Sequence, residues 1–339
     1  MKLGDLSVGY LYSLQAVLHS LGHDAAALFR RYRISPELLA QPQARISIPR
    51  FMRLGHAAIQ LSGRSDIGLL MGQHSQPAHL GLPGVSAQCA PTLAQAFDTL
   101  VRFERLTSQN YRGHSSFQAP ATRFYSISPY NQFNLFVVDS ALASRMQLAR
   151  QLTAGAAQLR EVHIEFPAPA YAERYEVLFG CPVLFEQAHN QLLWDPASLQ
   201  LPLQQSAPGT HAQLLELCQR QLQELTRHRD LRERVEEILS PRLHSQLPEL
   251  DDVAARLGMA GWTLRRRLKA EAGVGFQDII DEIRKDLALS YIRDTETALG
   301  EIAFLLGFSS PAAFQRAFKR WTGTAPGQYR REARMEKAE

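Results

Sequence analysis

Basic side chains near the C-terminus of this 339-residue chain carry the clearest chemical signal. Leu264 and Leu268 lie four residues apart, so on a helix they would share one buried face. The opposite face would then present side chains of the types that bind DNA phosphates and the base edges of the major groove. The candidate DNA-binding residues on this helix are Trp262, Thr263, Arg265, Arg266 and Lys269.

A row of arginines on one helix is more often a solvated surface than a DNA-reading one, so this helix alone decides little. A second copy of the pattern lies about fifty residues later, with one residue inserted. In each copy a short helix, a turn with glycine and a second helix follow one another, and a further glycine ends the second helix. The order is that of a helix-turn-helix unit, and duplication makes DNA binding the favoured interpretation. The recurring residues of the second copy are Ala303, Leu306, Gly307, Phe314, Arg316, Phe318, Lys319 and Gly323.

The second copy would expose a different set of side chains. Phe314, Phe318 and Trp321 predict its buried stripe, and glutamine and arginine on the other face can pair with adenine and guanine respectively. The candidate DNA-binding residues of this helix are Ala312, Gln315, Arg316 and Lys319.

A spacer helix is predicted between the two copies. Apolar residues recur at intervals of three or four from Phe276 to Tyr291, which indicates one helix of about seventeen residues, roughly 25 Å long. Successive major grooves on one face of a duplex are about 34 Å apart. One chain could therefore engage two grooves if the DNA bends.

The composition of the whole chain is that of a soluble globular protein, with 45% hydrophobic and 21% charged residues. A net charge of +4 favours an anionic partner without identifying one. The start of the chain lacks the apolar run of a secretory signal, and no later run approaches the ~20 residues that span a bilayer. We therefore expect a cytoplasmic protein without membrane contact. The three cysteines are far apart, so we expect free thiols, no metal site and no cofactor.

Two domains are expected from the chain length. Proline, glycine and glutamine interrupt the periodic pattern between Leu201 and Thr210, and we place the linker there. Residues 1–203 then form an N-terminal sensing and dimerisation domain, 204–228 a linker and connecting helix, and 229–332 the DNA-binding domain. Leucines at 214, 217, 222 and 225 predict the connecting helix, and 231–239 a further helix.

The N-terminal domain is predicted to be α+β. Its first hundred residues are mainly helical, with helices near 11–21, from Ser47 onwards and from about 91 to 106. Residues 123–127 and 133–138 then predict a hairpin, and strands are expected at 162–166, 183–185 and 191–194, with a helix at 171–179. The C-terminal domain is predicted to be all-α, with two helix-turn-helix units joined by a linker helix.

Residues 229–330 resemble the DNA-binding domain of the AraC/XylS family of bacterial transcription regulators. The resemblance is carried by VAARLGM (253–259), LRRRL (264–268), IAFLLGFS (302–309), FQRAFKRWTG (314–323) and Pro326. It implies that the first recognition helix reads bases through Trp262, Arg265 and Arg266, and that the second presents Pro311, Ala312, Gln315 and Arg316 to the groove.

This chain departs from the polar pattern of some family members. Pro311 and Ala312 cannot donate side-chain hydrogen bonds, so we expect the first unit to supply most base discrimination and the second to rely on Arg316, Lys319 and phosphate contacts. Ala260 stands where a serine-containing turn is usual, so the first recognition helix should lack a strong side-chain cap.

Residues 15–203 are similar to the arabinose-binding-like sensor domain of the type found in ornithine-utilisation regulators. RISIPRF (45–51), DIGLLMG (66–72), LGLPG (80–84) and TLAQA (92–96) carry this likeness. It implies a small-molecule effector, self-association as a homodimer and, with the DNA-binding domain, activation of transcription with RNA polymerase as a partner. Arabinose itself is not implied, because relatives respond to different metabolites.

An enzyme is not expected. His114, His163 and His189 are scattered without metal-ligand spacing, and the glycines at 81 and 84 lack the pattern of a phosphate-binding loop. One alternative stays open, in which the N-terminal domain is a dimerisation or partner-binding module that binds no ligand.

Overall fold

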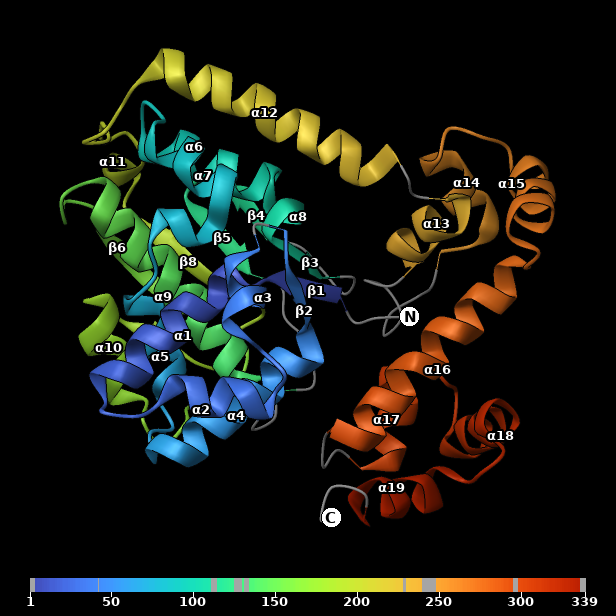
Figure 1. Cartoon of the computed structure of the whole chain (residues 1–339). Coiled ribbons are helices and arrows are strands. Elements are labelled where there is room, and N and C mark those ends of the chain that lie inside the picture. Colours follow the sequence, from blue (N-terminus) through green and yellow to red (C-terminus); the bar gives the residue numbers. More distant parts are fainter. Residues whose placement is uncertain are drawn as a thin grey trace. The chain divides into compact units, whose positions relative to one another are not determined.

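The computed structural model describes residues 4–41, 43–110, 115–124, 130, 134–227, 230–239, 248–294 and 298–335. The chain separates into two compact units, one formed mainly by residues 4–110 and 114–225 and the other mainly by residues 226–339 (Figure 1). The first unit combines helices with two sheets, whereas the second is entirely helical within the described residues. The predicted fold class is therefore confirmed.

Helices make up most of the first unit. They are α1 (Gly9–Ser20), α2 (Ala25–Arg31), α3 (Pro36–Ala40), α4 (Ile48–Ser62), α5 (Ile67–Gln73), the 3-10 helix η1 (Pro77–Leu80), α6 (Gly81–Gln88), α7 (Leu93–Arg102), α8 (Glu104–Thr107), α9 (Leu135–Leu152), α10 (Glu173–Phe179), α11 (Pro196–Leu199) and α12 (Pro208–Arg227). The predicted helical character of the first hundred residues is thus confirmed. Ser47 precedes α4 as expected, although its side chain makes no capping hydrogen bond.

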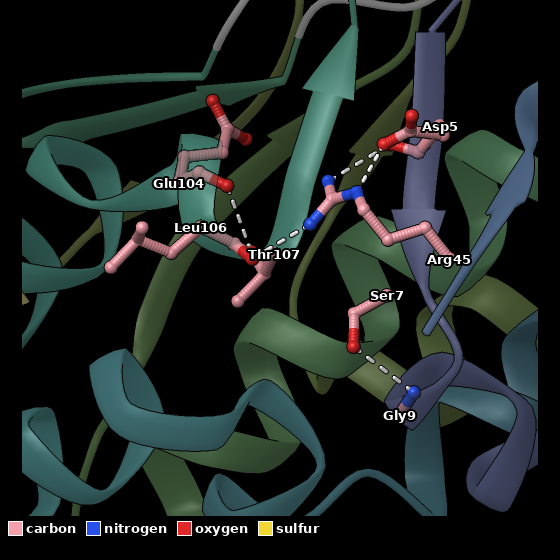
Figure 2. Close-up of polar contacts among 7 residues, drawn as sticks. All are labelled: Asp5, Ser7, Gly9, Arg45, Glu104, Leu106 and Thr107. Atoms are coloured by element: carbon pink, nitrogen blue, oxygen red, sulfur yellow. Dashed lines mark hydrogen bonds and ion pairs between the residues drawn. The ribbon is translucent and has the colours of Figure 1, made fainter. Parts of the chain in front are cut away.

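A small antiparallel sheet joins segments that are far apart in the sequence. Its strands are β1 (Gly4–Ser7), β2 (Arg45–Ser47) and β3 (Ser108–Asn110), in the order β2-β1-β3. Figure 2 shows the Arg45 side chain between Asp5 of β1 and the main chain of Leu106, where Nη1 donates to the carbonyl oxygen over 2.9 Å. One guanidinium therefore fixes the positions of β1, β2 and the segment before β3.

A larger sheet forms one side of the main hydrophobic core. It contains β4 (Ser116–Gln118), β5 (Ala121–Phe124), β6 (Leu159–His163), β7 (Val183–Leu184) and β8 (Asn190–Trp194) in the order β4-β5-β8-β6-β7. Trp194 at the end of β8 is fully buried, and its indole donates to Thr122 Oγ1 over 3.0 Å. Val138 and Leu142 of α9 lie in the same core cluster as Trp194.

The predicted hairpin over 123–127 and 133–138 is wrong. Leu135 begins the eighteen-residue helix α9, and Arg123 and Phe124 belong to β5, which pairs with β4 and β8 instead. Phe136 and Val138 favoured a strand locally, but both are buried on a helix whose apolar positions continue through Leu142 and Met146. Residues 125–129 and 131–133 of the expected hairpin, and His114, lie outside the described residues.

Two glycines allow α5 to approach α9 closely. A Cβ atom at Gly68 would lie 2.8 Å from the Asp139 Cβ, and one at Gly72 would lie 2.2 Å from the Ala143 Cβ. No larger residue fits at either position without moving a helix. The close approach buries Asp139 completely.

Helix α12, which we expected to connect the domains, packs on the first unit. His211 Nδ1 lies 2.8 Å from the main-chain oxygen of Ser86 in α6, and Cys218 is fully buried. Leu214 and Leu222 are partly buried, whereas Leu217 is 45% exposed and does not belong to the packed face.

The second unit contains two helix-turn-helix units. Its helices are α13 (Leu231–Leu239), α14 (Leu250–Arg256), α15 (Gly261–Arg267) with the π-helical turn η3 (Leu268–Ala272), α16 (Phe276–Asp294), α17 (Leu299–Leu305), α18 (Pro311–Thr322) and α19 (Pro326–Met335). Figure 1 shows α16 as one continuous helix with α13 to α15 near one end and α17 to α19 near the other.

The described residues hold no cluster of three or more His, Cys, Asp or Glu side chains placed to bind a metal ion. Within these same residues, every helix is too short or too polar to span a bilayer. Cys89, Cys181 and Cys218 are free thiols.

The buried carboxyl of Asp139 provides a pH-dependent contribution to the stability of the first unit. Tyr171 donates to Oδ2 over 2.8 Å and Tyr175 donates to Oδ1. Burial raises the pKa of Asp139 to about 7 from its ordinary value of 3.8, against the opposing effect of the two tyrosine hydrogen bonds. In the folded chain the protonated form is therefore favoured below about pH 7.

We predict that Asp139→Asn removes this pH dependence. A folded pKa above the unfolded value means that stability is fully present below pH 3.8 and is lost as pH rises to about 7. The loss is at most about 1.4 kcal/mol per pH unit within that window. The free energy of unfolding of the variant relative to the unmodified protein should thus rise by about 2 kcal/mol between pH 5 and pH 7, measured by urea unfolding.

Gln95→Leu, at an exposed position on α7, is the control: neither side chain titrates, so its stability difference should stay constant with pH. A constant difference for Asp139→Asn as well would contradict the prediction.

Candidate nucleic-acid interface

Helix α15 buries one face and exposes the other, as the leucine spacing predicts. Leu264 and Leu268 are fully buried, whereas Trp262 is 66% exposed. Thr263 is partly buried at the edge of the exposed face, and the other candidate residues on this helix are exposed: Arg265, Arg266 and Lys269. The structure therefore gathers the first candidate set on one surface of α15 and η3.

The three consecutive arginines of α15 have different environments. The Arg267 guanidinium is paired with Glu271 one turn later, with Nε 2.6 Å from Oε1. Arg266 lies over the Trp262 ring, 5.1 Å from its centroid, in a cation–π contact. Arg265 has no hydrogen bond or ion pair to any residue of the described ranges. The sequence alone does not distinguish these three residues, although the i,i+4 spacing of Arg267 and Glu271 could have indicated their pairing.

The start of α15 is uncapped by side chains, as expected. Ala260 occupies the N-cap position with extended backbone and makes no side-chain hydrogen bond to the helix. Gly261 follows because a Cβ atom there would lie 1.7 Å from Asp251 Oδ1 of α14. A side chain at position 261 would therefore require the Asp251 side chain to move.

Helix α18 is built differently. Ser310 Oγ accepts a hydrogen bond from the Ala313 main-chain nitrogen over 3.2 Å, and Pro311 occupies the first turn, where its missing N–H costs nothing. Phe314 and Phe318 are fully buried, and Trp321 is partly buried against Phe308. The exposed face carries the second candidate set and Pro311, as predicted: Pro311, Ala312, Gln315, Arg316 and Lys319.

Glycines end both recognition elements in the left-handed conformation. Gly273 follows η3 with φ 69°, and Gly323 follows α18 with φ 82°. Both positions favour glycine because other residues adopt positive φ with strain. The predicted C-terminal glycines are confirmed.

Helix α16 packs against both helix-turn-helix units through one apolar face. Ile279, Ile283 and Leu287 are buried at helical spacing, which confirms the predicted spacer helix at 19 residues. A helix of that length extends roughly 28 Å.

Adjacent polar side chains of α16 add directional contacts to helices on both sides. Glu282 pairs with Arg232 of α13, whereas Asp281 accepts from Arg320 of α18 over 3.2 Å. Sequence reasoning missed these pairs, because their partners lie about 40 to 50 residues away on other helices.

Arg284 makes the most extensive of these contacts. Its Nε donates to the Leu306 carbonyl oxygen over 2.9 Å and its Nη2 to the Gly307 carbonyl oxygen over 3.1 Å. The guanidinium also lies 4.9 Å from the centroid of the Phe308 ring. Burial lowers its pKa. Arg284 thus satisfies carbonyl groups at the C-terminal end of α17 and fixes the turn that precedes α18.

The sequence matches two protein families. Residues 22–203 match the arabinose-binding domain of AraC transcription regulators, and residues 253–332 match a helix-turn-helix domain. The ornithine utilization regulator of Pseudomonas aeruginosa is 30% identical over 329 residues, which cover 95% of each chain. The transcriptional regulator VirS of Mycobacterium tuberculosis is 27% identical and covers 97% of this chain and 98% of its own.

Solved structures of regulators are also similar. The transcriptional regulator CdpR of Pseudomonas aeruginosa is 21% identical, with a TM-score of 0.47 over 95% of this chain and 98% of its own. The DNA-binding domain of AdpA, solved in complex with a target DNA, is 30% identical over 32% of this chain, with a TM-score of 0.29.

We predict that Arg284→Met destabilises the second helix-turn-helix unit selectively. The variant loses two hydrogen bonds to main-chain carbonyl groups and the contact with Phe308, which should cost about 1 to 3 kcal/mol. Relative to the unmodified protein, native-state hydrogen exchange in the variant should accelerate more for amides of α17 and α18 than for those of α14 and α15.

Lys285→Met changes the neighbouring residue of the same helix and serves as the control. Equal acceleration in both units for Arg284→Met would show that Arg284 stabilises α16 as a whole and would refute the selective role.

Proposed function

Because this chain belongs to the AraC family of transcription regulators, we propose that its C-terminal unit reads promoter DNA through α15 and α18 in two successive major grooves. The observation that carries the proposal is the duplicated unit, in which each recognition helix turns its apolar side chains inward and its polar or basic ones outward. A DNA-binding regulator of this type needs no catalytic residues.

The two recognition helices would contribute unequally. In α15, Trp262 and the arginines at 265 and 266 supply base contacts, and the cation–π contact holds the Arg266 guanidinium in place before DNA arrives. Thr263 and Lys269 flank them as phosphate ligands. In α18, Ala312 offers only an apolar contact, so Gln315, Arg316 and Lys319 carry the interaction.

We assign the remaining functions by chain segment. Residues 1–203 would bind a small-molecule effector and form the homodimer, 204–228 connect the domains, and 229–332 bind DNA. Effector control, activation of transcription and contact with RNA polymerase are part of this proposal. Such a regulator would act in the cytoplasm, where its promoter DNA lies.

We predict different effects for two basic residues of the first helix-turn-helix unit. Arg266→Ala should cost about 1 to 3 kcal/mol of binding free energy and relax the preference at one base pair. Lys269→Ala should weaken binding to all sequences alike and reduce the slope of log affinity against log salt by about one. Fluorescence anisotropy with DNA selected from a random library, and with its single-base variants, measures both effects.

Arg267→Ala is the matched control, because its guanidinium is already paired with Glu271. Its affinity for the selected DNA should change little. Uniform weakening across sequences by Arg266→Ala would contradict the base-reading role, and absence of any selected sequence would contradict the proposed function.

A second prediction concerns the effector. A compound that binds only the folded chain at a hundred times its Kd should stabilise it by about 2.7 kcal/mol, and its melting temperature should rise accordingly. Ornithine, after which one relative is named, belongs in the first metabolite panel. A broad panel without any shift would favour the alternative in which the N-terminal unit is a dimerisation or partner-binding module without a ligand.

A further inference from the structure

A pocket of about 280 Å³ lies within the N-terminal unit and has an unusual lining. It is bounded by η1, the C-terminal ends of α6 and α9, and the segment that precedes α12. Most of its lining residues are glutamines, and the others are apolar. The glutamines are Gln76, Gln88, Gln151, Gln204 and Gln205.

The lining favours a ligand without charge. No charged side chain is among the described residues that form the pocket. An ionic ligand would lose hydration there without gaining a counter-charge. Each glutamine amide offers both donors and an acceptor, which suits hydroxyl or amide groups.

The amide of Gln151 is fixed and incompletely paired. Its Nε2 donates to the Ser75 carbonyl oxygen over 3.1 Å, and Ser75 Oγ in turn lies 2.6 Å from Ser144 Oγ. Its Oε1 is buried and has no hydrogen-bond partner in the described part of the chain. A buried acceptor without a partner is costly, and that cost would be removed if the Gln151 amide turned to accept from a hydroxyl or N–H donor of a ligand in the pocket.

The pocket also adjoins the residues that hold the start of α12. The Gln204 nitrogen donates to the Leu152 carbonyl oxygen over 3.0 Å, and the Ala207 nitrogen donates to the Cys89 carbonyl oxygen over 3.0 Å. Gln88 ends α6, the helix whose Ser86 contacts His211 in the first turn of α12. A ligand between these glutamines would bridge α6, α9 and the segment leading into α12.

We propose that this pocket is the effector site, that its ligand is an uncharged small molecule with several hydroxyl or amide groups, and that occupancy changes the packing of α12. The inference rests on the proposed function, because it assigns a site to the expected effector. It also predicts that ornithine, which carries charges, does not bind here.

Two pairs of probes that differ in charge test the ligand class on the full chain. They are myo-inositol with inositol 1-phosphate, and cyclic glycylglycine with its linear zwitterionic form. Saturation-transfer NMR at millimolar concentration should show binding of at least one neutral probe, with its charged counterpart at least tenfold weaker. Equal binding of the charged counterpart, or no binding of either neutral probe, overturns the proposal.

Variants of the lining locate the binding. Gln151→Leu should weaken binding of the neutral probe about tenfold, since it removes the unpaired acceptor. Gln88→Leu, which replaces a side chain without a structural hydrogen bond to another described residue, should weaken it several-fold and covers the case in which Gln151→Leu fails to fold. Gln60→Leu, at an exposed position on α4 outside the pocket, should bind as the unmodified chain does. Unchanged binding by folded Gln151→Leu and Gln88→Leu overturns the location.

Hydrogen exchange tests the coupling to α12. Saturating neutral probe should slow exchange of the main-chain N–H groups of α12, and unchanged exchange overturns the coupling. Binding to selected DNA is measured on the same samples. DNA binding without probe binding refutes the pocket proposal and leaves the proposed function intact. Absence of sequence-selective DNA binding by the unmodified chain refutes the proposed function itself.

Discussion

The positions of the two recognition helices depend on the contacts of α16. Its apolar face drives association, but the hydrophobic effect has little directionality and would allow neighbouring helices to slide or rotate. Hydrogen bonds have defined distances and angles, so Asp281, Glu282 and Arg284 set the register that burial leaves open. The proposed binding of α15 and α18 in two successive major grooves would require this fixed register, because the grooves have a fixed spacing.

The two helix-turn-helix units have similar structures but are stabilised by different interactions. In the second helix-turn-helix unit, α18 is stabilised by the Ser310 cap and by a proline in its first turn. The packed aromatic rings of Phe308, Phe314 and Phe318 stabilise it further. In the first helix-turn-helix unit, α15 is short and has no side-chain cap. Its stability depends on Leu264, Leu268 and the close turn at Gly261. The first helix-turn-helix unit instead exposes the larger side chains of Trp262, Arg265 and Arg266. The repeat is therefore conservative in its buried positions and divergent on its surface.

The sequence predicted those features that depend on local periodicity. The spacer helix, the terminal glycines and the buried faces of α15 and α18 follow from spacing within about twenty residues, and the structure confirms each of them. Features formed over long distances were missed. The sheet of β1, β2 and β3 joins very short strands held by Arg45, and no alternation marks them in the sequence. The start of α9 was assigned to a strand because its local residue types favour one, whereas burial along the whole helix decides the outcome.

The route from the glutamine pocket to the DNA-binding unit requires few elements. Contacts from α6 and α9 hold the beginning of α12, and buried Cys218 keeps the middle of that helix against the first unit. Only residues 228–230 separate the end of α12 from α13 in the sequence. Arg232 of α13 then pairs with Glu282 of α16, the helix that positions both recognition helices. In the proposed mechanism a ligand alters the packing of α12, and α12 is followed directly in the sequence by the segment that leads to α13.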